Sequence, residues 1–285
     1  MVKVALLGGD ERQNQLAKEL RRRGYTVAGF GNAVEDRGAD LAGTLNGARV
    51  VILPVPATRN GVFLSQGAAG AEIAFSQVLA LLEPGVLLLG ALFPPAWIEA
   101  AKECGAICLD YYREETVQLR NALPTAEGAL RLAMQELPVT LFGVETAVVG
   151  YGRIGSLLCE KLIALGAKVG VLARAPAALA QAELHGARIG AFSQGAPPFF
   201  RECRVLFNTV PERVLSRPFL QALPENCILI ELASAPGGFD PALAKELGFR
   251  VVTAQGLPGR FYPETAGKIL ADAVCAILEA NGFSH

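Results

Sequence analysis

Hydrophobic residues occur along this chain in short runs, and amphipathic stretches lie between the runs. In the first half the runs are bounded by Gly, Pro or charged residues, and they are residues 2–7, 25–30, 49–54, 85–92 and 106–111. Bounded runs of this length are typical of buried strands, and the intervening residues 11–23 and 96–104 have helical spacing. Strands that alternate with helices predict an α/β domain with a parallel sheet over residues 1–120.

The second half has the same pattern. Its strand-like runs predict a further domain over residues 143–261, and they are residues 146–149, 167–174, 205–208, 227–231 and 250–253. A linking helix is expected over residues 121–142, and a C-terminal helix over residues 262–285 is expected to return to the first domain. The predicted fold class is α/β, with two doubly wound Rossmann-like domains, parallel sheets and a cleft between the domains.

The linking segment contains a proline. Its helical pattern runs from about residue 116 to residue 137, and Pro124 lies inside it. Proline lacks a backbone donor and disfavours helical geometry in the residue before it, so a break is expected at Leu123 and Pro124. Thr125 then fits the N-cap of a new helix.

The clearest chemical signal is the sequence TAVVGYGRIG at residues 146–155, in which a strand-like run is followed by G-x-G-x-x-G. Gly150 permits the tight turn, Gly152 lets the backbone approach a pyrophosphate, and Gly155 lets the helix pack closely on the strand. The free N–H groups of the helix that opens at Arg153 and Ile154 favour the negative charge of a diphosphate. The alternative is a glycine-rich turn without a ligand, but the strand that follows at once favours a dinucleotide site.

The end of that following strand bears on which dinucleotide binds. NAD sites place Asp or Glu there to accept hydrogen bonds from the ribose 2′-hydroxyl. Here Ala173 and Arg174 hold the position, and the next carboxylate is Glu183. Because Arg pairs with a 2′-phosphate, NADP is the expected cofactor and NAD is an accepted substitute. The alternative is an exposed Arg174 at the start of a helix.

The ends of later strands supply further candidates for dinucleotide contacts. Strand-end residues often line the nicotinamide pocket in two-domain dehydrogenases, and here they are Asn208, Thr209, Val210, Pro211, Ala233, Ser234 and Gly256. Their Gly and Pro content also fits simple strand-terminating turns.

Composition limits the classes of function. The chain has 285 residues, 52% of them apolar, and a formal net charge of −1, so a broad basic surface for nucleic acid is not expected. The longest apolar run, residues 86–93, is too short to cross a membrane, and the N-terminus shows no secretory signal. The six cysteines have neither zinc-site nor C-x-x-C spacing, which indicates no metal and a reducing cytoplasm.

Several motifs together resemble one family, the A-subunit of dipicolinate synthase, which acts in the formation of spore dipicolinate. The motifs extend from the first strand to the last helix, and they are LLGGDERQ at residues 6–13, ILPVPAT at 52–58, NALPTAEG at 121–128, NTVP at 208–211, ELASAPGGFD at 231–240, GLPG at 256–259 and TAGKIL at 265–270. Glu231 and Ala235 depart from the family pattern, in which Asp and Arg are expected.

The resemblance implies NADP- or NAD-dependent oxidation of a dihydrodipicolinate, formed from the 4-hydroxy-tetrahydrodipicolinate of the lysine pathway, to dipicolinate. It also implies a partner, the flavoprotein-like B-subunit of dipicolinate synthase, and a place in the cytoplasm of the mother cell of a sporulating bacterium. A homo-oligomer is left open, and neither a membrane nor a nucleic acid is expected as a partner.

This chemistry directs attention to the predicted strand-end loops. A dianionic substrate needs cations, and Arg12, Arg59 and Lys268 are candidates whose alternative is a solvated surface charge. The carboxylates best placed to take a proton are Glu127 and Asp10, with Thr58 and Thr125 as hydrogen-bond partners and Ser234 as a further substrate contact. For Asp10 the alternative is a helix N-cap.

Two other classes of function stay open. A relative of the 2-hydroxy-acid or alanine dehydrogenases would share the two-domain plan, but neither His185 nor His285 is placed as its base. A non-catalytic NADP-binding sensor would keep the glycine motif without needing the cationic loops.

Overall fold

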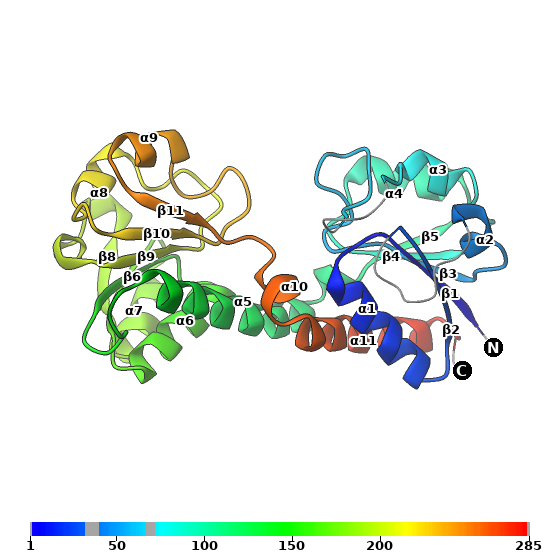
Figure 1. Cartoon of the computed structure of the whole chain (residues 1–285), viewed down its shortest axis with the longest axis horizontal. Helices are drawn as coiled ribbons and strands as arrows, with labels where there is room; N and C mark the ends of the chain where they lie inside the picture. The colour runs from blue at the N-terminus through cyan, green and yellow to red at the C-terminus, as the bar shows by residue number, and fades with distance from the viewer. Residues whose placement is uncertain (1, 32–39, 67–71, 284–285) are drawn as a thin grey trace. The chain divides into compact units, whose positions relative to one another are not determined.

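The structure is a computed structural model, and it describes residues 2–31, 40–66 and 72–283 (Figure 1). The chain forms two compact units, one of Met1–Asn121 with Pro258–His285 and the other of Ala122–Leu257. Each unit contains one parallel sheet with helices packed against it, as the sequence predicted. None of the helices in the described part of the chain has both the length and the apolar content of a bilayer-spanning segment.

The first unit is built on a five-stranded sheet. Its strand order is β2-β1-β3-β4-β5, and the strands are β1 (Lys3–Leu7), β2 (Thr26–Phe30), β3 (Val50–Ile52), β4 (Leu87–Gly90) and β5 (Ile107–Asp110). The register pairs Val4 with both Val27 and Val50, so apolar residues meet across the centre of the sheet. Because helices cover both faces of a parallel sheet, its inner strands read as continuous apolar runs.

Helices pack on the two faces of this first sheet. On one face α1 (Glu11–Arg22) lies alongside the C-terminal helix α11 (Pro263–Ala280), and Leu16, Leu20 and Leu270 belong to one buried cluster (Figure 1). The other face carries α2 (Leu41–Leu45), α3 (Phe75–Leu79) and α4 (Pro95–Glu103). The return of the C-terminal helix to the first unit was expected by analogy with other two-domain dehydrogenases, and α11 occupies Pro263–Ala280 of the range 262–285 expected for it.

The second unit is built on a six-stranded sheet of order β11-β10-β9-β6-β7-β8. The strands are β6 (Glu145–Val149), β7 (Lys168–Ala173), β8 (Arg188–Ala191), β9 (Val205–Asn208), β10 (Ile228–Glu231) and β11 (Arg250–Thr253). Strand β8 was not predicted, because this four-residue edge strand begins with exposed residues and has no apolar run. The helices of this unit are α6 (Arg153–Ala164), α7 (Pro176–Leu184), α8 (Arg217–Gln221) and α9 (Pro241–Glu246), and α10 (Leu257–Phe261) begins at its boundary.

The linking helix differs from the prediction. Helix α5 is continuous over Glu115–Glu136, with Pro124 inside it and Thr125 in its interior rather than at an N-cap. An interior proline removes one backbone hydrogen bond and costs about 3 kcal/mol. Ala126, Ala129 and Ala133 on the same helix are fully buried, so packing of this small-residue stripe is the favourable term that opposes the cost.

Candidate functional site

The glycine turn between β6 and α6 has the geometry that its motif requires. Gly150 has φ +92°, and a Cβ on it would lie 2.4 Å from Thr209 Oγ1. A Cβ on Gly155 would lie 2.3 Å from the Gly150 carbonyl oxygen, so only glycine lets α6 pack this closely on the turn. A Cβ on Gly152 would have no atom within 4 Å, so the backbone there faces open space. Close packing and open approach therefore occur at the positions where the sequence predicted them.

A cavity of about 250 Å³ adjoins this turn at the carboxyl ends of the strands. Parallel α/β sheets bind ligands at this edge. The lining residues come from the turn and from the segments after β7 and β9, and they are Gly150, Tyr151, Gly152, Ala173, Arg174, Ala175, Ala178, Phe192, Val210, Glu212 and Val214. Gly150, Gly152, Arg174 and Val210 were predicted among them, whereas Glu212 was not, because no local motif marks it.

Polar side chains in and beside the cavity pair with one another. Arg174 Nη1 lies 3.6 Å from Glu212 Oε2, and the two side chains are 83% and 63% exposed. The Tyr151 hydroxyl lies 2.8 Å from Nδ1 of His185. His185 thus has a polar contact beside the glycine turn, a position that the sequence did not predict for it.

The remaining residues expected at the dinucleotide lie at the ends of the same strands. Arg153 is exposed and Ile154 is half-buried in the first turn of α6, while Pro211 and Gly256 are exposed after β9 and β11. The Thr209 hydroxyl donates to the Val149 carbonyl at 2.8 Å, so it fastens the β9 end to the β6 end. Contact between these residues and a cofactor stays a prediction.

Asn208 and Glu231 form a buried hydrogen-bonded pair between the ends of β9 and β10. Asn208 Nδ2 donates to Glu231 Oε1 at 2.6 Å, and the backbone N–H groups of Ala233 and Gly238 donate to the same carboxylate at 2.9 Å. Burial raises the pKa of Glu231, and these three hydrogen bonds oppose the rise. The Asn208 side chain is fully buried, and its amide also donates to the Val210 carbonyl at 2.9 Å, so it holds the loop after β9 in place. A direct contact of Asn208 with a dinucleotide stays a prediction.

Ser234 follows Glu231 in the loop after β10, and its side chain is exposed. Its carbonyl accepts from the Gly237 N–H at 2.9 Å across a turn that contains the cis peptide between Ala235 and Pro236. The hydroxyl is therefore presented from a loop whose backbone is fixed by the turn and by Glu231.

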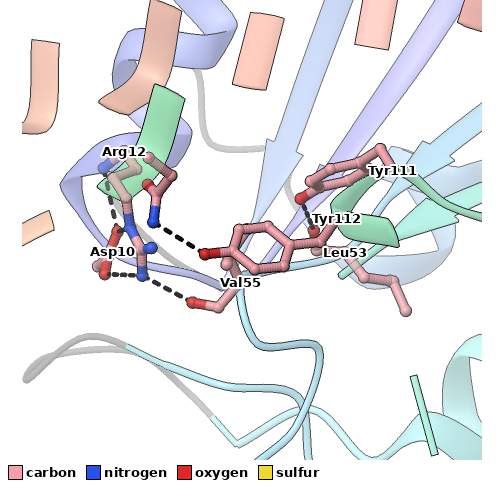
Figure 2. A network of polar contacts seen from close by, with 7 residues as sticks. Asp10, Arg12, Leu53, Val55, Tyr111 and Tyr112 are labelled. Atoms are coloured by element: carbon pink, nitrogen blue, oxygen red, sulfur yellow. Dashed lines mark hydrogen bonds and ion pairs between the residues drawn. The ribbon is translucent and has the colours of Figure 1, made fainter. Parts of the chain in front are cut away.

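In the first unit, Asp10 and Arg12 are each other's partners (Figure 2). Asp10 is the N-cap of α1 and accepts from the Arg12 backbone N–H at 3.1 Å, as predicted for the cap. The Arg12 guanidinium donates to both Asp10 carboxylate oxygens, at 2.8 and 2.7 Å, and to the Val55 carbonyl at 2.6 Å. Only 8% of the Arg12 side chain is exposed, so it is a buried ion-pair partner and not the solvated surface charge that was the alternative to substrate binding. Its contact with a substrate stays a prediction.

Two tyrosines after β5 lie beside this ion pair (Figure 2). Tyr111 is fully buried, its hydroxyl donates to the Leu53 carbonyl at 3.4 Å, and burial raises its pKa well above the usual value. The Tyr112 hydroxyl accepts from Asn121 Nδ2 at 2.8 Å. These neutral groups and the ion pair make a polar network at the carboxyl ends of β1, β3 and β5.

Thr58 and Arg59 lie in the loop after β3. The Thr58 hydroxyl donates to the Phe63 carbonyl at 2.6 Å and accepts from the Gly61 N–H at 3.0 Å, so it closes a local turn. Arg59 is exposed at the tip of this turn. Of the two predicted cations in these strand-end loops, Arg59 is therefore the solvated one.

Buried polar atoms without partners lie near the end of β1. Among the residues that the structure describes, both amide atoms of Gln13 and of Gln66, and the Ser65 hydroxyl, have no hydrogen-bond partner. A Cβ on Gly9 would lie 2.2 Å from Gln13 Cγ, and one on Gly8 would lie 3.2 Å from Gln66 Nε2. The glycine pair thus makes room for both amides. These side chains were not predicted as site residues, although the Gly8–Gly9 pair was a local signal.

The other predicted catalytic residues are divided between the units. Glu127 belongs to the second unit, where its carboxylate lies 3.1 Å from Lys161 Nζ, and Thr125 is half-buried two residues earlier on α5. Lys268 is exposed on α11 of the first unit. The roles predicted for these residues in proton transfer and substrate binding stay predictions.

The fold and the glycine turn first define a class. A parallel six-stranded sheet that carries G-x-G-x-x-G at its first turn is the Rossmann architecture of dinucleotide-dependent dehydrogenases. The chain shares its fold with a transhydrogenase from Sinorhizobium meliloti, with a TM-score of 0.72 and 17% identity over 98% of this chain and 94% of that one.

The particular resemblance is to the A-subunit of dipicolinate synthase. Residues 3–112 match the family model of the dipicolinate synthase A-subunit N-terminal domain. The chain is 28% identical to the dipicolinate synthase A-subunit of Bacillus subtilis, over 97% of this chain and 96% of the relative. A crystal structure of the dipicolinate synthase A-subunit from Bacillus halodurans superposes with a TM-score of 0.86 at 27% identity, over 97% of each chain. The resemblance predicted from the sequence motifs is confirmed over nearly the whole chain.

Proposed function

We propose that this chain is an NADP- or NAD-dependent oxidoreductase that converts a dihydrodipicolinate to dipicolinate, in the role of a dipicolinate synthase A-subunit. The observation that carries the proposal is the open backbone at Gly152 beside a cavity at the strand ends, in a chain that resembles that enzyme over 97% of its length. A bound nicotinamide would supply a hydride acceptor, and loss of one hydride and one proton makes the substrate ring aromatic. Since aromatisation provides driving force, positioning contributes more than a strong base.

The residues divide between two tasks in this proposal. The N–H groups at the start of α6 and the turn at Gly152 receive the diphosphate, and Arg174 faces the adenosine end. In the first unit, the exposed cation of Arg59 and the unpaired amide and hydroxyl groups near Gly8 and Gly9 support binding of a polar, dianionic ring. Release of the proton falls to a carboxylate, Glu127 or Asp10, or to solvent.

The proposal includes the flavoprotein-like B-subunit as partner and the mother-cell cytoplasm as location, because the resembled family has both. A homo-oligomer is compatible with it. Each is separable from the reaction itself, because the reaction needs only the substrate and the dinucleotide.

The test is a coupled assay of the purified chain with and without the B-subunit. Enzymatically generated 4-hydroxy-tetrahydrodipicolinate is supplied with NADP⁺ or NAD⁺, and dipicolinate is followed by its ultraviolet absorbance. Formation of dipicolinate that depends on the dinucleotide is the expected result. Dinucleotide binding without product under every combination would overturn the proposed reaction.

A second candidate is a non-catalytic dinucleotide sensor, and one observation favours it. Both carboxylates expected to accept the proton are engaged in ion pairs, Asp10 with Arg12 and Glu127 with Lys161. Each carboxylate already has a cation of the chain as its partner, so it would have to leave that partner to take a proton from a substrate. A sensor would bind NADP⁺ with unchanged affinity after Glu127→Gln and form no dipicolinate before or after the change.

A further inference from the structure

The cavity beside the glycine turn contains two opposite charges from different loops. Arg174 follows β7 and Glu212 follows β9, and of the residues that line the cavity they are the cation and the carboxylate. Their charged atoms are 3.6 Å apart, and both side chains are more exposed than buried. An exposed ion pair of this kind is weak, so either side chain can turn to a ligand at little cost.

The sheet order explains how Glu212 reaches this cavity. Strand β6 lies between β9 and β7, so the loops that follow β9 and β7 flank the glycine turn on its two sides. Dehydrogenases that prefer NAD carry their ribose-binding carboxylate at the end of the strand equivalent to β7. Here that strand ends in Ala173, and the carboxylate enters the same cavity from the β9 side.

We propose that Glu212 and Arg174 together set the discrimination between the two dinucleotides, with Glu212 acting for NAD and Arg174 for NADP. The proposal rests on the dinucleotide binding of the proposed function and names the residue pair that tunes it. A ribose 2′-hydroxyl donates to the Glu212 carboxylate, whereas a 2′-phosphate is attracted by Arg174 and repelled by Glu212. Because the pair is neutral overall, the parent chain accepts both dinucleotides, where Arg174 alone would favour NADP.

The experiment measures dissociation constants by titration calorimetry on the full chain, with NADP⁺, NAD⁺, 2′,5′-ADP and 5′-AMP as probes. The last two carry only the adenosine end, so they isolate this part of the cavity. The variants are Glu212→Gln and Arg174→Gln. A matched control is Arg217→Gln, which breaks an exposed ion pair with Glu246 at 2.9 Å on the same unit. Neither residue of the control pair lines the cavity.

Opposite shifts are expected from the two variants. Glu212→Gln is expected to tighten the binding of NADP⁺ and 2′,5′-ADP by about two- to fivefold and to weaken the binding of NAD⁺, because an exposed charge contributes about that much to binding. Arg174→Gln is expected to weaken the binding of NADP⁺ and 2′,5′-ADP by about the same factor and to leave the affinity for 5′-AMP nearly unchanged. The control leaves the ratio of the NADP⁺ and NAD⁺ constants at its parent value. These shifts shrink as salt concentration rises, because the charges are exposed.

Several results would overturn the proposal. If Glu212→Gln leaves the ratio of the NADP⁺ and NAD⁺ dissociation constants unchanged, or shifts it only as much as the control does, Glu212 does not contribute to the discrimination. If dipicolinate is formed but the ratio does not move, this inference fails and the proposed function stands. If the ratio moves as expected but no dipicolinate forms, the reaction fails and the inference stands. A parent chain that binds neither dinucleotide overturns both.

Discussion

Replacing Gly152 and Gly155 by alanine, one at a time, separates binding from folding at the glycine turn. A Cβ on Gly152 meets no atom within 4 Å, and the backbone there is extended at φ −91° and ψ −158°, which alanine adopts. Gly152→Ala is therefore expected to leave the free energy of unfolding unchanged or to raise it by about 0.4–1 kcal/mol through the unfolded state. The same methyl group would occupy the space of the diphosphate, so dinucleotide affinity should fall at least about tenfold, or about 1.4 kcal/mol.

Gly155→Ala is expected to lower the stability of the fold. Its Cβ would lie 2.3 Å from the Gly150 carbonyl oxygen, and that turn is held by the bond from the Gly150 N–H to the Leu172 carbonyl at 2.8 Å. Overpacking against backbone costs about 1–3 kcal/mol or more, while the better helix propensity of alanine returns only about 1 kcal/mol. A net loss of about 1 kcal/mol or more is expected, and it lowers the melting temperature by about 3 °C or more.

Thermal unfolding without ligand and calorimetric titration with NADP⁺ test both variants. The expected pattern is a Gly152→Ala protein with parent stability and weak binding, and a Gly155→Ala protein with a lower melting temperature. Parent-like NADP⁺ binding by Gly152→Ala would refute the assignment of the open backbone to the diphosphate. A destabilised Gly152→Ala protein would refute the packing argument.

Three further changes test the polar groups. Asp10→Ala leaves the buried Arg12 guanidinium without its carboxylate and removes the α1 N-cap, so urea unfolding should show a loss of about 3–5 kcal/mol; a loss below about 1 kcal/mol would contradict the buried-pair assignment. Gln13→Met removes amide atoms that have no partner among the described residues, so the free energy of unfolding should stay the same or rise by about 1 kcal/mol, and a clear fall would show that the amide is satisfied. The hydrogen bond from Arg250 lowers the pKa of Glu136 from its usual 4.5, so the stability it contributes is present above that value and is lost as the pH falls below it. Glu136→Gln should flatten the decline of the melting temperature on acidification, and an equal decline in both proteins would remove the pair from the acid response.

The sequence by itself determined the positions of most strands and of the main helices. Strand β9 coincides with its predicted range, and helix α11 occupies Pro263–Ala280 within the predicted range 262–285, because burial on both faces of a parallel sheet and on one stripe of a helix leaves a local apolar pattern. The separate demands on Gly150, Gly152 and Gly155 were also local, since each follows from its place in one turn. The whole-chain resemblance to the dipicolinate synthase A-subunit came from motifs of the same local kind.

Tertiary structure alone decided which polar groups meet. The carboxylate of Glu212 enters the cavity of Arg174 because β9 and β7 flank β6. The order of strands in a sheet cannot be predicted from the sequence of any single segment. The same holds for Asn208 and Glu231, which are 23 positions apart and form a buried hydrogen bond because β9 pairs with β10. Pro124 stays inside a helix because packing of its neighbours outweighs a local preference. Local periodicity records burial, whereas the partners of a charge depend on which chain segments the fold brings side by side.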